Sequence, residues 1–275
     1  MTSRIKTILA VAMFGMLALI VTPRAQEKEA AETKGEVKPL RALMVTGGCC
    51  HDYEVQKLII STGISKRANV AWTIVHEGGG SRDHKVSIYS KADWAKGYDV
   101  IVHNECFGGV KDDAFIEGIT KAHKEGTGSV ALHCTAHSYR AAKTDEWRKM
   151  LGVSSYNHGP KNPIIMKNLK KDHPVMKGFP DTWTTPNGEL YNIDKIWDTA
   201  TPLAMGKAAG KENVCVWVNK YGKGRTFGTT IGHHNETMME KTYLDLITRG
   251  LLWSCDKLSA DGTPKPGYAP TAATK

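Results

Sequence analysis

The stretch from Gly128 to Tyr139 carries the side chains in this sequence that are best placed to do chemistry. An apolar run at 130–132 predicts a buried strand, and His133, Cys134 and then His137 follow it. An imidazole can move protons or bind a metal ion, and a thiolate can act as a nucleophile. In open α/β sheets ligands bind beyond the carboxyl ends of the strands, so these groups lie where a site is expected. A single histidine is as often a packing residue as a catalyst. Whether His133 belongs to a functional site therefore depends on which residues follow the other strands.

Three further predicted strands also lead into histidine, cysteine or acidic residues. These groups are His51 and Asp52 after the strand at 41–45, His103, Glu105 and Cys106 at the end of the strand at 99–103, and His233 and His234 after the strand at 226–231. The carboxyl ends of parallel strands meet at one edge of a sheet. We therefore expect these side chains to share a pocket.

The set His51, Asp52, His133, Glu189 and His233 suits two kinds of chemistry. In one, imidazoles hold a divalent metal ion that polarises a carbonyl group or activates water, with His51, His133 and His233 as the expected ligands. In the other, a histidine and Glu189 exchange a proton with a carbon beside a carbonyl group, as in an isomerase, lyase or hydratase. Spacing along the sequence does not separate the two.

We expect five catalytic candidates and four substrate contacts in this pocket. The catalytic candidates are His133, His233, Glu189, Asp52 and Glu105, and the substrate contacts are His51, Tyr191, Arg225 and Cys134. Tyr191 could stack against a sugar ring, although aromatic residues in such segments more often serve packing. Arg225 could orient a hydroxyl or a carboxylate, or equally hold its strand through a salt bridge. The glycine clusters at 78–80 and 222–224 lack the strand and helix context of a phosphate loop, so no nucleotide cofactor is expected.

The elements that must position these residues alternate between strand and helix. Strands are expected at 41–45, 70–75, 99–103 and 129–133, with helices at 53–66 and 112–125 between them. This alternation predicts an α/β fold with a mostly parallel sheet and helices on both faces. In the second half, strands at 214–218 and 226–231 are joined by a turn at 220–224, and a helix at 242–253 closes the domain.

The two ends of the chain differ from the middle in composition. Basic residues precede an apolar segment at 8–21, which predicts a signal peptide at 1–25 and therefore export to the periplasm or the medium, with no stable membrane span after processing. A polar stretch at 26–39 is expected to be a linker, the domain to span 40–256, and the Pro- and Gly-rich tail at 257–275 to be disordered.

Charge and cysteine content narrow the class of protein further. The formal net charge is +9, but the basic residues are scattered, so no nucleic-acid partner is expected. The six cysteines do not suggest a disulfide framework, because a domain of this size does not need one. Neighbouring Cys49 and Cys50 are expected to be poor partners for each other.

The order of several short motifs resembles the ThuA-like, or trehalose-utilisation, family. The motifs are Gly47-Gly48 with His51-Asp52, Ala131-Leu132-His133, Gly152, His173-Pro174, Glu189-Leu190-Tyr191, the run from Tyr221 to Arg225, Gly232-His233, and the run from Arg249 to Trp253. The resemblance covers about 40–255. It implies a flavodoxin-like, class I glutamine amidotransferase-like fold, in which the turn after a central strand usually presents a nucleophilic cysteine and a later histidine completes the site.

This sequence departs from that nucleophile motif. The resemblance places His133 at the cysteine's position, and both flanking glycines are missing. Glutamine hydrolysis by a thiolate is therefore not expected, although a turn shifted by one residue would present Cys134 with His233 as its base.

The resemblance implies carbohydrate metabolism, including oxidised 3-keto sugars. We therefore expect an exported hydrolase, lyase or isomerase that acts on a small-molecule carbohydrate, with or without a divalent metal ion. The alternative is a non-catalytic carbohydrate-binding protein on the same fold, which would present an exposed aromatic platform in place of clustered ionisable groups.

Overall fold

The computed structural model describes residues 38–271. The predicted signal peptide at 1–25, most of the predicted linker at 26–39 and residues 272–275 lie outside the described residues. In the part of the chain that is described, no helix combines the length and the apolar character needed to cross a bilayer.

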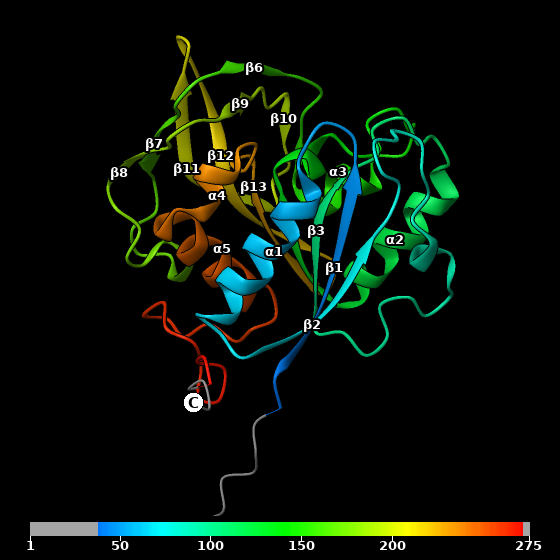
Figure 1. Cartoon of the computed structure of the whole chain (residues 1–275), viewed down its shortest axis with the longest axis horizontal. Coiled ribbons are helices and arrows are strands. Elements are labelled where there is room, and N and C mark those ends of the chain that lie inside the picture. The colour runs from blue at the N-terminus through cyan, green and yellow to red at the C-terminus, as the bar shows by residue number, and fades with distance from the viewer. Residues whose placement is uncertain (1–37, 272–275) are drawn as a thin grey trace, which may run out of the picture. The chain divides into compact units, whose positions relative to one another are not determined.

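A nine-stranded mixed sheet forms the centre of the fold (Figure 1). Its order is β2 (Val70–His76), β1 (Leu40–Gly48), β3 (Val100–Cys106), β4 (Gly128–Leu132), β13 (Gly224–Thr229), β12 (Lys211–Tyr221), β11 (Ala200–Ala208), β7 (Ile165–Asn168) and β8 (Thr182–Thr184). The first five strands in this order are parallel and the remaining pairs are antiparallel. The predicted α/β fold with a mostly parallel region is confirmed, as is the turn between β12 and β13.

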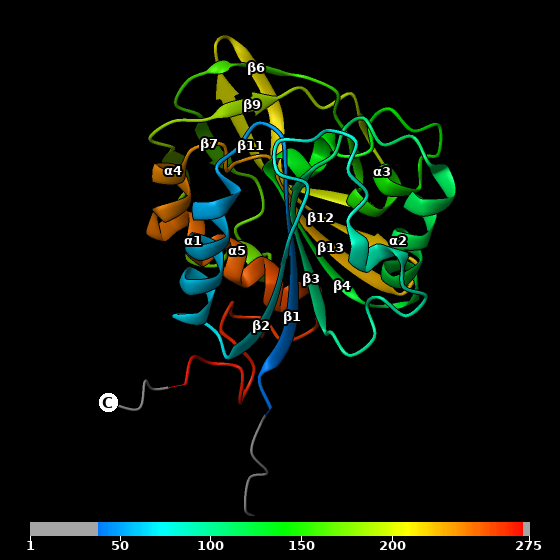
Figure 2. The ribbon, with the colours of Figure 1, turned by 45° about the vertical axis from the view of Figure 1, so that its right-hand side comes forward.

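Helices cover both faces of the parallel strands (Figure 2). One face carries α1 (Tyr53–Ser65), α4 (Asn235–Met239) and α5 (Lys241–Ser254), and the other carries α2 (Asp113–Glu125) and α3 (Glu146–Leu151). Short 3-10 turns lie at Ser87–Ser90, His133–His137 and Pro174–Met176. Ile60 from α1 and Ile247 from α5 are fully buried against one face, and Ile116 from α2 is fully buried against the other. Such two-sided burial leaves the strand ends as the place where polar groups can meet.

Two small antiparallel pairs lie outside the main sheet. One joins β6 (His158–Lys161) to β9 (Glu189–Tyr191), and the other joins β5 (Val153–Ser154) to β10 (Lys195–Ile196). Figures 1 and 2 place β6 and β9 beyond the carboxyl ends of the parallel strands. The pair therefore brings a segment from the irregular middle of the chain over the expected site.

The expectation of a disordered tail at 257–275 is wrong for the residues that the structure describes. Leu258 is only 7% exposed, and Tyr268 packs against the same core. The backbone N–H of Asn69 donates a hydrogen bond of 3.0 Å to the carbonyl oxygen of Tyr268. Two apolar side chains in a Pro- and Gly-rich segment thus provide enough buried surface to hold it on the domain.

Candidate metal centre

The turn after β4 holds His133 in an unusual backbone conformation. Its φ is +46°, in the left-handed region that non-glycine residues seldom adopt, and its side chain is buried. Strained conformations of this kind cluster at functional sites because the surrounding structure must impose them. Gly232 approaches from the loop after the neighbouring strand β13 with a φ of +136°, and a Cβ there would meet the His133 Cβ at 3.3 Å. The close passage of the two chain segments explains the glycine that precedes His233.

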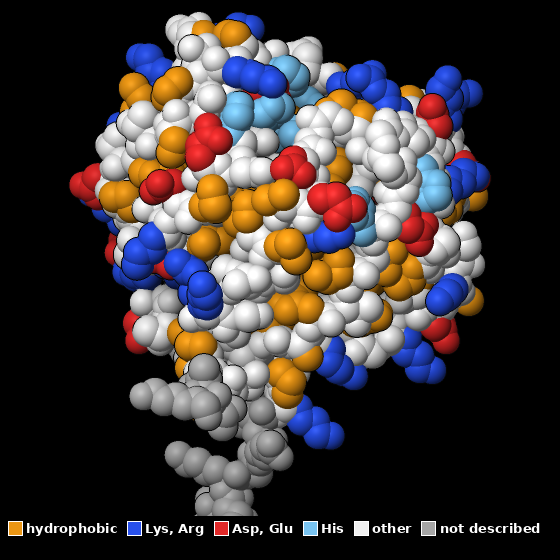
Figure 3. Space-filling view, viewed as in Figure 1, with side chains coloured by type: hydrophobic (Ala, Val, Ile, Leu, Met, Phe, Trp, Pro, Cys, Tyr) orange, Lys and Arg blue, Asp and Glu red, His pale blue; other side chains and the backbone are white. Residues whose placement is uncertain are grey.

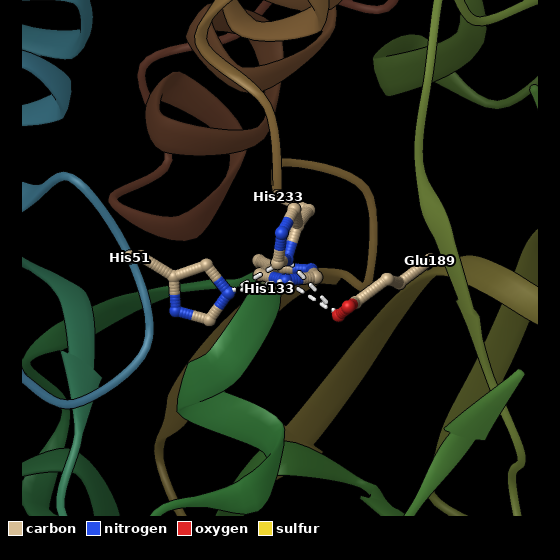
Figure 4. A group of neighbouring side chains, drawn as sticks. All are labelled: His51, His133, Glu189 and His233. Carbon is tan, nitrogen blue, oxygen red and sulfur yellow. Dashed lines mark hydrogen bonds and ion pairs between the residues drawn. The ribbon is translucent and has the colours of Figure 1, made fainter. Parts of the chain in front are cut away.

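Four side chains from four segments converge at this point (Figure 4). They are His51 from the loop after β1, His133 from the turn after β4, Glu189 from β9 and His233 from the loop after β13. One donor atom from each lies within 4.8 Å of all the others. The predicted set of three histidines is therefore brought together, and Glu189 joins it.

The distances inside the cluster are close to those of a metal-ligand set. His51 Nε2 lies 2.9 Å from His233 Nδ1 and 3.0 Å from His133 Nε2. Glu189 Oε2 lies 3.0 Å from His233 Nδ1 and 3.7 Å from His133 Nε2. Ligand atoms placed tetrahedrally at zinc bond lengths are about 3.3 Å apart, so that small movements would seat an ion among them. The donor types, three imidazole nitrogens and a carboxylate oxygen, also fit such an ion.

The outer nitrogens of two of these rings are already engaged. His133 Nδ1 lies 2.6 Å from the carbonyl oxygen of Thr230, and His51 Nδ1 lies 3.2 Å from the hydroxyl of Tyr53. A carbonyl oxygen only accepts hydrogen bonds, so His133 Nδ1 must carry the hydrogen, which leaves a lone pair on Nε2 facing the cluster. Contacts of this kind orient histidine ligands in metalloproteins.

The protonation states also suit metal binding. Burial, together with the neighbouring His233, lowers the pKa of His51 to about 4. Burial and the nearby His51 hold the pKa of His133 well below its ordinary value. Burial acts to raise the pKa of Glu189, but the hydrogen bond and charge of His233 outweigh it and lower the pKa overall. Neutral imidazoles beside an ionised carboxylate are the forms that coordinate metal ions.

Two of the other predicted residues lie beside the cluster. The Tyr191 hydroxyl is 3.2 Å from His133 Nε2, but the ring is buried and stacked on His137, so it is not free to stack on a sugar. Asp52 accepts the N–H of Val55 at the start of α1 and the side-chain amide of Asn235. Asp52 borders a hollow of about 600 Å³ outside the cluster without belonging to the ligand set. Figure 3 shows histidine side chains gathered around a hollow at the top of that view.

Glu105, expected to be catalytic, is directed away from the cluster. It is fully buried and contacts His103 Nδ1 at 2.8 Å and the Tyr89 hydroxyl at 2.7 Å. Burial raises its pKa to about 8. The expectation failed because Glu105 lies within β3, where it shares a face of the sheet with His103, and not in the loop after the strand.

Arg225, expected to contact substrate, lies at the opposite edge of the sheet. It follows Gly224, the first residue of β13, whereas the cluster lies beyond the last residue of that strand. Its guanidinium pairs with Asp256 at 3.3 Å. The salt bridge that we held as the alternative is therefore the observed role.

The cysteines form two disulfides, although no disulfide framework was expected, and the expectation that the neighbours Cys49 and Cys50 are poor partners is wrong. Cys49 is joined to Cys50, and Cys106 is joined to Cys134. The Sγ atoms of Cys49 and Cys106 are 3.8 Å apart, so that the two bridges lie side by side. Three of these cysteines, Cys49, Cys106 and Cys134, are buried together at neighbouring strand ends, a proximity that the argument from domain size did not consider. Cys134, expected to contact substrate or to serve as a nucleophile, carries no free thiol here.

Sequence reasoning missed His158 and Arg140. His158 Nε2 lies 3.7 Å from Glu189 Oε2, and its ring stacks on Tyr191. Its position depends on the pairing of β6 with β9, in which it lies opposite Tyr191. No local sequence pattern predicts that pairing. A histidine followed by Gly159 and Pro160 in a polar stretch could, however, have marked His158 as a candidate site residue.

Comparisons with known proteins identify the family and show which solved structures have a similar fold. A family profile described as trehalose utilisation, ThuA, matches residues 41–254. A solved ThuA-like protein of Parabacteroides merdae ATCC 43184 is 18% identical with a TM-score of 0.67, covering 86% of this chain and 96% of that one. A ThuA-like protein of Bacteroides uniformis ATCC 8492 is 17% identical with a TM-score of 0.62, covering 82% and 96%.

A more distant likeness is to a GMP synthase protein of Thermoplasma acidophilum. It is 13% identical with a TM-score of 0.51, covering 79% of this chain and 94% of that one. Identities this low show the fold alone. A search of curated proteins found no match.

Proposed function

The chain belongs to the ThuA, or trehalose-utilisation, family, which is class I glutamine amidotransferase-like, and from this membership we propose that it is an exported, metal-dependent enzyme acting on a carbohydrate. The observation that carries the proposal is the convergence of His51, His133, His233 and Glu189 within 4.8 Å. A cluster of imidazoles with one carboxylate at the carboxyl edge of a parallel sheet is an arrangement that enzymes use.

We assign the three histidines to the metal ion and Glu189 to proton transfer. A divalent ion bound there would polarise a sugar carbonyl or lower the pKa of a bound water. The Glu189 carboxylate is ionised and can accept a proton, while burial holds the pKa of Tyr191 well above its ordinary value, so that its hydroxyl can donate a hydrogen bond to a substrate oxygen. This division of roles serves a hydrolase, in which the proton comes from water, or a lyase or isomerase, in which it comes from carbon.

The same geometry argues against glutamine hydrolysis. That reaction needs a thiolate at the turn after the central strand, and His133 occupies the turn. The neighbouring Cys134 is bound to Cys106. The family's fold is therefore retained here without the thiol chemistry of the amidotransferases.

Two observations support export and catalysis over the alternatives. The disulfides Cys49–Cys50 and Cys106–Cys134 are typical of an oxidising compartment, in agreement with the predicted signal peptide. A non-catalytic carbohydrate-binding role would need an exposed aromatic platform, whereas Tyr191, the aromatic residue at the cluster, is only 1% exposed.

The test measures metal content and turnover in the same preparations. We expect the purified protein to bind one divalent ion, to lose turnover of a 3-keto-glucoside on chelation, and to recover it with one ion. His133→Ala should lose both the ion and turnover, whereas Glu189→Gln should keep the ion and lose turnover by at least about a hundredfold. His173→Ala, a change in a histidine that packs against Trp253, is the matched control and should alter neither. Full turnover in metal-free protein would overturn the proposal.

A further inference from the structure

A second hollow adjoins the cluster and differs from the first in charge. It has a volume of about 240 Å³ and shares His51 with the metal centre as part of its wall. The larger hollow on the other side of His51 is bordered by Asp52 and Glu236 as well as by Lys161. The smaller hollow is bordered by no acidic residue among those that the structure describes. Its ionisable wall consists of Arg82, Arg140, His51, His137 and His158, and the disulfide-bonded cysteines complete it.

Both arginines keep most of their hydrogen-bond donors free. Arg140 Nη1 donates to the carbonyl oxygen of Tyr156 at 2.7 Å, and Arg82 Nη2 lies 4.0 Å from Cys50 Sγ. Among the described residues, no carboxylate pairs with either guanidinium, although the Asp83 carboxylate packs against Gly109, a residue of the wall. A guanidinium has five N–H donors, so that each of these side chains has several left for a ligand.

The backbone holds the two arginines in place. The N–H of Gly109 donates to the carbonyl oxygen of Arg82 at 2.9 Å. A Cβ at Gly108 would lie 3.3 Å from Arg140 Nε, so the glycine lets this side chain lie close against the loop. The positive charge of Arg140 is felt inside the site, where it helps burial to lower the pKa of His137 to about 3. The backbone at Arg82 and the side chain of Arg140 are therefore positioned before any ligand arrives.

We infer that this hollow is an oxyanion subsite and that the carbohydrate substrate carries a carboxylate or a phosphate group. Paired guanidinium groups from separate segments are suited to both, because each presents parallel N–H donors to two oxygens of the ligand. The inference rests on the proposed function, since the sugar's reacting carbon would then lie at the metal centre beside His51. A volume of about 240 Å³ holds the charged group with part of a ring and leaves the remainder to the larger hollow.

Calorimetric binding of three matched probes tests this inference. The probes are glucose, glucuronate and glucose 6-phosphate, each titrated into the full-length protein with and without its metal ion. We expect at least one anionic probe to bind at least tenfold more tightly than glucose, in metal-free protein as well as in loaded protein. The two anionic probes together show whether the group is a carboxylate or a phosphate.

The variants Arg82→Gln and Arg140→Gln should each weaken binding of the preferred anion about tenfold and leave glucose unchanged. Arg225→Gln removes the same charge at the opposite edge of the sheet and should change nothing. Metal content, measured in every variant, separates this inference from the proposed function. Failure of the native protein to bind metal refutes the function, whereas equal binding of glucose and both anions by metal-loaded protein refutes the subsite. Unchanged anion binding in the double variant Arg82→Gln/Arg140→Gln would refute it as well.

Discussion

The Nδ1 atom of His133 lies 2.6 Å from the carbonyl oxygen of Thr230. The two residues follow β4 and β13, which pair in parallel with Leu132 opposite Thr229. A backbone carbonyl next to β13 thus orients the imidazole of His133, because this hydrogen bond places the hydrogen on Nδ1 and leaves the lone pair on Nε2. The ring therefore presents this lone pair to the other members of the cluster, as the proposed metal ion requires.

Tyr53→Phe should weaken metal binding about tenfold without abolishing it. The change removes only the hydroxyl that lies 3.2 Å from His51 Nδ1, and such outer contacts orient the ligand ring. Competition against a coloured chelator measures the affinity. Tyr98→Phe, near the amino edge of the sheet, is the matched control, and equal affinities of the two variants would contradict the prediction.

Tyr191→Phe should retain the metal ion and lower kcat about tenfold to a hundredfold, with a smaller effect on KM. Its hydroxyl lies 3.2 Å from His133 Nε2, inside the site, and the remaining ring keeps its stacking on His137. Steady-state kinetics on the substrate identified by the turnover assay gives both constants. A change in KM alone would assign Tyr191 to binding and not to the chemical step.

Metal binding should raise the melting temperature by about 5 to 10 °C when the free ion is present at a hundredfold excess over its Kd. The reason is that the proposed ion binds three histidines that only the folded chain brings together, and it has no preformed site in the unfolded chain. Scanning calorimetry with increasing ion concentration measures the shift. His133→Ala should melt at the same temperature with and without the ion.

The buried Glu105 should make stability depend on pH. Burial raises its pKa from 4.5 to about 8, so the folded protein binds this proton more tightly than the unfolded chain. Its contribution to stability is complete below pH 4.5 and is lost as the pH rises to about 8, at no more than about 1.4 kcal/mol per pH unit.

Glu105→Gln removes this dependence and isolates it from other groups. Its unfolding free energy relative to the native sequence should increase between pH 4.5 and 8 and stay level above that range. Denaturant unfolding at a series of pH values measures the difference. Glu125→Gln, on an exposed surface, should show a difference that does not vary with pH.

Leu258→Ala should cost about 2 to 3 kcal/mol in unfolding free energy. The side chain is 7% exposed and belongs to the core that includes α1 and α5. Urea denaturation checks the value. A loss below about 0.5 kcal/mol, as expected of an exposed tail, would restore the original expectation for this segment.

The sheet and three of the four cluster residues could be predicted from sequence because they depend on local patterns. Each of His51, His133 and His233 follows an apolar strand, and parallel strands bring such ends together without knowledge of any other contact. Glu189 came from its family motif. The pairing of β6 with β9, which delivers it, joins distant residues in a polar stretch that has no periodic signal.

The failures also have physical causes. Glu105 was expected in a loop but lies inside β3. Side chains within a strand point to one face of the sheet or the other, and that of Glu105 is therefore buried against a face instead of reaching the site. Arg225 lies at the beginning of β13, and the cluster lies beyond the end of that strand. The prediction failed because it did not consider at which end of the strand the residue stands. The Cys106–Cys134 disulfide depends on the lateral distance between the ends of β3 and β4, which the sequence composition does not show. The bridge between the neighbours Cys49 and Cys50 was judged unfavourable on geometric grounds alone.

The four converging side chains are spread from position 51 to position 233 of a chain of 275 residues. A growing polypeptide that has not yet reached His233 therefore cannot assemble the centre. If the centre holds an ion as proposed, that ion can be bound only after the last strand of the parallel region and the loop after it have been made. Occupancy of the centre would thus report that this part of the sheet is complete.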